Sequence, residues 1–173
     1  MATEPVAYFL TWTTYGTWLH GRDPASVDRD HNTPGTPLLA PDPEREAANR
    51  AAMRQPEYRL DAIRRMLVLR AILTVARHRG WRVWAAHVRT NHVHVVVSAD
   101  CTPEKVLEDF KAWASRRLRV TLGEDADRDR WTQHGSTRYL WDEASAWEKV
   151  EYVVTGQGPP MSVYNGSVEE HHP

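Results

Sequence analysis

The sequence has a single cysteine, few lysines and no long apolar run. One cysteine, Cys101, excludes an internal disulfide framework and suits a reducing cytosol. The first residues, Met1–Pro5, contain no basic stretch followed by an apolar one, so we expect no signal peptide. Because no apolar run approaches the length that crosses a bilayer, we predict a soluble cytoplasmic protein without membrane contact.

A strong net charge is also absent. The formal net charge is -1 over 173 residues, which argues against a protein that coats duplex DNA through bulk electrostatic attraction. Nearly all of the positive charge is arginine, because the only lysines are Lys105, Lys111 and Lys149. Guanidinium groups bind phosphate and stack on bases, although an arginine-rich genome composition would produce the same bias. The sequence contains eight tryptophans, a high number for this length, and some of them could stack on unpaired bases.

The most informative motif is His92-Val93-His94, at the head of a run of valines. Its alternation predicts a β-strand that turns both imidazoles to one face and Val93, Val95 and Val97 towards a core. Two imidazoles at this spacing can chelate one divalent cation. The alternative is a half-buried strand whose polar face happens to carry histidines.

The remaining periodicities predict one α+β domain. We expect strands near residues 8–13, 81–88, 92–98 and 137–141, and helices at 60–78 and from Thr102 to Gly123. A last helix is expected from the capping box Ser145-x-x-Glu148 to Gly156. This order is the ferredoxin-like split βαβ arrangement, a central antiparallel sheet with helices on one face, plus a C-terminal helix. The valines should meet those helices, which leaves the two histidines on the open face.

The domain boundaries follow from composition. Residues 1–158 are predicted to form a single domain, and residues 159–173 a loosely ordered tail. A long insertion at about residues 21–56 is rich in Pro, Gly, Asp and Asn, with a short helix expected at 44–53.

Tyr152 on the last helix is the candidate reactive residue. On a helical wheel Trp147, Val150 and Val154 cluster on one side, and Tyr152 falls roughly opposite them. Aromatic residues on short helices are usually core residues, but this placement disfavours a core role. Gln157, just past the helix end, could supply a carbonyl oxygen to a metal or could be a simple helix-terminal polar residue.

In combination these segments resemble the HUH endonucleases, specifically the single-tyrosine transposases of small bacterial insertion sequences and the REP-associated tyrosine transposases. His92-Val93-His94 is similar to their His-hydrophobic-His signature, and Tyr8–Leu19 resembles the opening of one subgroup. Glu151–Gly158 resembles the stretch that carries the nucleophilic tyrosine and a metal-binding glutamine. In the better-known members the glutamine follows the tyrosine by four residues, whereas Gln157 follows by five. Glu148, one turn before the tyrosine, is therefore an alternative third ligand.

The resemblance implies a metal-dependent endonuclease or transposase that acts on single-stranded DNA by transesterification. Tyr152 would attack a backbone phosphate and form a 5′-phosphotyrosine link. His92, His94 and Gln157 would hold Mg²⁺ or Mn²⁺. The resemblance further implies a homodimer, associated with the bacterial nucleoid, that acts at hairpin-flanked sites. A domesticated protein that binds single-stranded or hairpin DNA without cleaving it is the alternative function.

Other assignments remain open at the level of sequence. The candidate DNA contacts are Arg116, Arg117 and Arg119 for the backbone and Trp12, Trp18 and Trp131 for base stacking. If the turn between the two strands holds two residues, His87 pairs with His92 and shares its face. If the turn holds three residues, His87 faces the valines. A histidine-triad hydrolase is disfavoured because Val96 stands where a third histidine is needed. A small metal-binding protein without a nucleic-acid role is a further alternative, and Tyr139 is the second choice of nucleophile.

Overall fold

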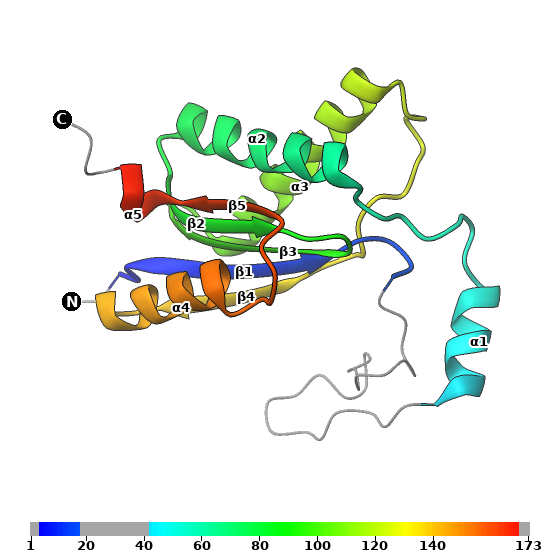
Figure 1. The fold of residues 1–173 in the computed structure, drawn as a ribbon, viewed down its shortest axis with the longest axis horizontal. Helices are drawn as coiled ribbons and strands as arrows, with labels where there is room; N and C mark the ends of the chain where they lie inside the picture. Colours follow the sequence, from blue (N-terminus) through cyan, green and yellow to red (C-terminus); the bar gives the residue numbers. More distant parts are fainter. Residues whose placement is uncertain (1–3, 18–41, 170–173) are drawn as a thin grey trace.

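A computed structural model describes residues 4–17 and 42–169 (Figure 1). The elements are β1 (Ala7–Thr13), α1 (Pro43–Ala51), α2 (Ala62–Arg79), β2 (Arg82–Val88), β3 (His92–Ser98), α3 (Pro103–Leu122), β4 (Ser136–Leu140), α4 (Glu143–Thr155), β5 (Ser162–Asn165) and α5 (Gly166–Glu169). Most of the predicted insertion lies outside the described residues, but its short helix is present as α1. Among the described helices, none combines the length and the apolar character needed to cross a membrane.

The strands form one five-stranded antiparallel sheet in the order β4-β1-β3-β2-β5. The first four positions are the ferredoxin-like order, so the predicted α+β fold class is confirmed. Helices α2 and α3 cover one face of the sheet, and α4 lies against the other (Figure 1). The sheet therefore lies between a layer formed by α2 and α3 and a layer formed by α4.

Side-chain alternation along the central strand β3 decides what each face carries. Val93, Val95 and Val97 are fully buried in the core that α2 and α3 share with the sheet. Val96 points the other way and packs with Val150 and Val153 of α4. The histidines share the face of Val96, as their spacing predicts.

The ends of α2 and α3 follow local capping rules. Asp61 accepts a hydrogen bond from the backbone N–H of Arg64, and α2 stops at Gly80, whose φ of 73° is the left-handed conformation that glycine adopts readily. Thr102 caps α3, with Pro103 in its first turn as predicted.

The start of α4 differs from the prediction. Asp142, not Ser145, is the N-cap, and its carboxylate accepts from the Ser145 N–H at 2.7 Å. Both residue types cap helices well, so local sequence does not choose between them.

The predicted loose tail is also corrected. Residues 162–165 form β5, which pairs with the outer edge of β2 and places Val163 opposite His87. A short helix, α5, follows it, and residues 170–173 lie outside the described part. The folded unit thus extends beyond residue 158, because β2 offers an unpaired edge that no local sequence pattern reveals.

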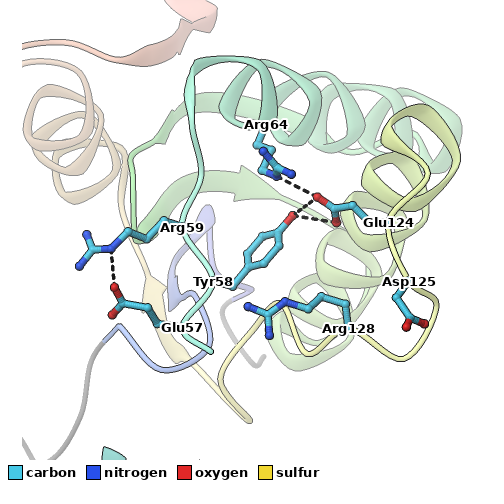
Figure 2. Close-up of a pocket in the computed structure, with 7 residues that line it drawn as sticks. All are labelled: Glu57, Tyr58, Arg59, Arg64, Glu124, Asp125 and Arg128. Atoms are coloured by element: carbon cyan, nitrogen blue, oxygen red, sulfur yellow. Dashed lines mark hydrogen bonds and ion pairs between the residues drawn. The ribbon is translucent and has the colours of Figure 1, made fainter. Parts of the chain in front are cut away.

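A buried ion-pair cluster joins the chain after the insertion to the loop that follows α3 (Figure 2). The Glu124 carboxylate accepts from the Tyr58 hydroxyl at 2.8 Å, from Arg64 Nε at 2.8 Å and from Arg130 Nε at 2.9 Å. Arg128 lies 5.1 Å from the centre of the Tyr58 ring. The charges that line this pocket are thus largely satisfied by one another, which is typical of a structural cluster rather than a binding site.

Candidate functional site

The two histidines of β3 are held by one hydrogen bond each at Nδ1. His94 lies 7% exposed between β1 and β2, and its Nδ1 is 2.8 Å from the Thr11 hydroxyl. His92 Nδ1 donates to the side-chain carbonyl of Asn91 at 2.7 Å. The ring centres of the two histidines are 4.9 Å apart. Because Nδ1 is occupied on both rings, Nε2 is the nitrogen left for another partner.

The side chain of Gln157 interacts with both rings. Burial, together with the neighbouring His92, lowers the pKa of His94 to about 3. Burial also lowers the pKa of His92, whereas a hydrogen bond with Gln157 raises the pKa of each ring. A hydrogen bond raises a histidine pKa when the protonated ring donates it, and the only acceptor on a glutamine side chain is its carbonyl oxygen. That oxygen therefore faces both imidazoles, which are neutral at pH 7.

Glu148, the alternative third ligand, points elsewhere. Its side chain is 74% exposed and pairs with Lys149 at 3.3 Å. Gln157 follows Tyr152 by five residues instead of four, but it lies beyond the last residue of α4, where the chain turns back towards β3. The extra residue therefore does not keep the glutamine from the histidines. The structure thus brings Gln157, and not Glu148, to the histidines.

Tyr152 lies beside the same histidines. Its ring centre is 5.8 Å from that of His94, and the side chain is 43% exposed. Phe9 of β1 supports the arrangement, because it stacks on His94 at 5.6 Å and meets Tyr152 edge-on at 6.0 Å. Lys149 Nζ lies 5.7 Å from the centre of the tyrosine ring. An accessible phenol, a cation and two imidazoles therefore share one side of the sheet.

Tyr139, the second choice of nucleophile, lies on the opposite face. It pairs with Tyr8 across β1 and β4, and Tyr8 belongs to the core that α2 and α3 cover. The ring centres of Tyr139 and Tyr8 are 5.3 Å apart. The sheet therefore separates this tyrosine from the histidines.

Two of the predicted stacking residues, Trp12 and Trp131, are not at the site. Trp12 is 1% exposed and packs against Phe110 of α3, so its prediction as a stacking platform is wrong. Trp131 is half-buried beside Trp12, and its indole N–H donates to Ser115 at 2.8 Å, which indicates a structural role. Trp18 lies outside the described residues.

The arginines predicted to contact DNA lie on the other side of the sheet. Arg116, Arg117 and Arg119 belong to α3, which covers the face opposite the histidines. The structure does not group them with Tyr152. Their contact with the DNA backbone stays a prediction.

His87 is the residue that sequence reasoning left undecided. Arg89 N–H donates to the His92 carbonyl at 2.9 Å, so the turn holds two residues and His87 shares the histidine face. Its cross-strand partner is His94 and not His92, because the two-residue turn pairs Arg89 with His92. However, the ring is fully buried and both nitrogens are engaged, Nδ1 with the Val153 carbonyl and Nε2 with the Met161 N–H, each at 3.0 Å. Burial lowers the pKa of His87 as well.

The candidate donor set consists of two imidazoles and an amide. In the described ranges, no three His, Cys, Asp or Glu side chains gather in a way that could hold a metal ion. The set formed by His92, His94 and Gln157 is not a group of that kind, because its third donor is the neutral amide oxygen of a glutamine.

Comparison with known proteins yields similarity of fold. No family model matches the chain, and no curated protein matches its sequence. One similar solved structure is a REP-associated tyrosine transposase bound to a REP hairpin, with 11% identity, a TM-score of 0.48, and coverage of 88% of this chain and 67% of that one. Another is a transposase candidate from Deinococcus radiodurans R1, with 13% identity, a TM-score of 0.43, and coverage of 86% and 88%. These likenesses concern the fold alone.

Proposed function

We propose that this protein is a metal-dependent single-stranded DNA endonuclease and transposase whose nucleophile is Tyr152. The observation that carries the proposal is the convergence of an accessible tyrosine, two neutral imidazoles and an amide oxygen on one face of the sheet. The resemblance of the three sequence motifs to HUH transposases supports the same assignment.

The donor set fits a divalent cation. His92 Nδ1 donates to Asn91 and His94 Nδ1 is bonded to the Thr11 hydroxyl, so Nε2 of each ring and the Gln157 carbonyl oxygen are the atoms that could bind a cation. Fixing Nδ1 through a second residue is typical of metal-binding histidines. Two nitrogens and one oxygen suit Mn²⁺ or Mg²⁺. When bound, the cation would polarise a non-bridging phosphate oxygen as a Lewis acid.

The chain's own residues supply the nucleophile and a positive charge. The Tyr152 oxygen attacks phosphorus, the bond from phosphorus to the 3′ oxygen breaks, and the proton lost by the phenol ends on that departing oxygen. The products are a 5′-phosphotyrosine and a free 3′-hydroxyl. Because the phosphotyrosine conserves the energy of the phosphodiester, rejoining needs no nucleotide triphosphate. Lys149 places its ammonium beside the ring, where a DNA phosphate can be attracted.

A cleavage assay tests this function. The protein is incubated with an end-labelled single-stranded hairpin from the flanks of its own gene, in Mn²⁺ or in EDTA, and run on a denaturing gel. We expect a covalent protein–DNA adduct in Mn²⁺ and none in EDTA. Hairpin binding on a native gel without any adduct in Mn²⁺ would instead favour the domesticated, non-cleaving DNA-binding protein.

The assembly state follows from the same proposal. The resemblance implies a homodimer that recognises a hairpin and cuts near its foot, and we propose this form for the chain. Sedimentation of the protein with and without the hairpin measures it directly. A monomer in both conditions would remove the dimer from the proposal and leave the chemistry at Tyr152 intact.

The third ligand can be identified by metal affinity. We expect Gln157→Ala to weaken Mn²⁺ binding on the order of 10–100-fold, because removing a ligand should cost at least as much as removing an outer-shell partner. Glu148→Ala is the matched control and should leave the affinity unchanged, since that side chain is 74% exposed and points away. Isothermal titration calorimetry on the folded variants measures both. Loss of Mn²⁺ affinity in Glu148→Ala alone would show that Glu148, and not Gln157, is the third metal ligand.

A further inference from the structure

Gln157 lies in a segment that does not fix its own conformation. It follows the last residue of α4, Thr155, and is flanked by Gly156 and by Gly158, whose φ is 77°. Glycines widen the range of backbone conformations, so such a segment needs external contacts to hold one side chain in place. Within the segment, the Gln157 amide makes only a long bond of 3.5 Å to the Tyr152 carbonyl.

The external contacts come from β2. His87 Nδ1 donates to the carbonyl of Val153, four residues before Gln157, and Nε2 accepts from the N–H of Met161, four residues after it. Arg89 donates to the carbonyl of Pro159 at 2.9 Å. Both flanks of the glutamine are therefore tied to the strand beside β3.

We propose that His87 is a positioning residue that holds both flanks of Gln157 and thereby sets the third metal ligand against His92 and His94. The inference rests on the proposed function, because it assigns a role relative to the proposed metal ligands. His87 itself contacts neither DNA nor metal in this account.

The chemistry of a neutral imidazole suits this role. The Val153 carbonyl is among the last four of α4, which lack a partner within the helix and need one from outside. A rigid ring with one donor and one acceptor on different sides can satisfy that carbonyl and the Met161 N–H at once. Because the ring is fully buried, an apolar replacement loses both bonds and leaves both backbone groups unpaired.

The test is a double-mutant cycle on metal affinity. We expect His87→Leu to weaken Mn²⁺ binding on the order of 10–100-fold, the range for outer-shell changes. In a Gln157→Ala background the same substitution should have almost no further effect, since the ligand that it positions is already gone. A general loss of structure would instead weaken binding by a similar factor in both backgrounds.

A second variant guards against a folding failure of the leucine protein. His87→Asn keeps a donor near Val153 and loses the bond to Met161, so we expect a folded protein with intermediate affinity and faster amide hydrogen exchange at Met161. Unchanged Mn²⁺ affinity in folded His87→Asn and His87→Leu, or equal losses in both backgrounds, would overturn the inference alone. Absence of Mn²⁺ binding in the unaltered protein would overturn the proposed function, and this inference with it.

Discussion

Replacing Tyr152 with phenylalanine is expected to abolish formation of the covalent DNA adduct. The substitution removes only the hydroxyl oxygen that attacks phosphorus, so the rate should fall on the order of 10⁴-fold or more, as when other catalytic nucleophiles are removed. The ring contacts with Phe9 and His94 remain possible, and the fold should be retained. The measurement is the yield of adduct on a denaturing gel, together with the thermal unfolding midpoint of the variant.

Tyr139→Phe is the matched control for this prediction. It makes the same chemical change on the opposite face of the sheet, at a side chain of nearly equal exposure, 42% against 43%. We expect full adduct yield from this variant. An adduct that survives the change at residue 152 and disappears with the change at residue 139 would show that the reactive tyrosine had been misassigned.

Replacing Glu124 with alanine is expected to lower the free energy of unfolding by about 3–5 kcal/mol, the cost of breaking a buried ion pair by removing one partner. The side chain of Arg130 is only 4% exposed and would keep its charge without the carboxylate. Tyr58 would lose its acceptor at the same time. Urea unfolding at pH 7 measures the change.

Glu46→Ala serves as the control for an ion pair in water. Glu46 bonds Arg50 one turn along α1, and the two side chains are 28% and 48% exposed. Its removal should change the free energy of unfolding by about 0.3–0.5 kcal/mol. Equal effects of the two alanine variants would contradict a buried role for Glu124.

The same cluster predicts the acid sensitivity of the fold. Burial by itself raises the pKa of Glu124, but hydrogen bonds from Tyr58, Arg130 and Arg64 outweigh it and hold the pKa below its usual value. The carboxylate therefore stabilises the fold above its unfolded-state pKa, and this contribution is lost as pH falls through the folded-state value. We expect the difference in unfolding free energy between the unaltered protein and Glu124→Gln to shrink from pH 6 to pH 3. A constant difference across that range would contradict a stabilising role of the ionised Glu124 carboxylate.

The arrangement around β3 could be predicted from the sequence because it depends on local alternation. Residues two apart on a strand share a face, so the spacing of His92 and His94 and the valines between and after them determine which side each occupies. The same rule applied to β1 places Trp12 with Tyr8 and Leu10 in the core. Trp12 is therefore a core residue, and its prediction as a stacking residue, which rested on composition, is wrong.

The remaining features depend on contacts between distant segments. β5 is a four-residue strand of half-buried residues that forms only against the edge of β2. The choice of Gln157 over Glu148 depends on where the chain turns after α4. The role of His87 depends on the register of the hairpin and on the return of residues 159–161 to β2. In each case the contacting residues are far apart in the sequence, so a short stretch of sequence does not reveal the contact.

The most direct measurement is the identity of the residue that carries DNA after the reaction. The adduct is formed in Mn²⁺, trimmed with nuclease, digested with trypsin and sequenced by tandem mass spectrometry. Cleavage after Arg138 and Lys149 places Tyr139 in one peptide, and Tyr152 with Tyr164 in the next. We predict a nucleotide mass on the second peptide, with fragment ions that assign it to Tyr152. A nucleotide on Tyr139 or Tyr164 would contradict the account.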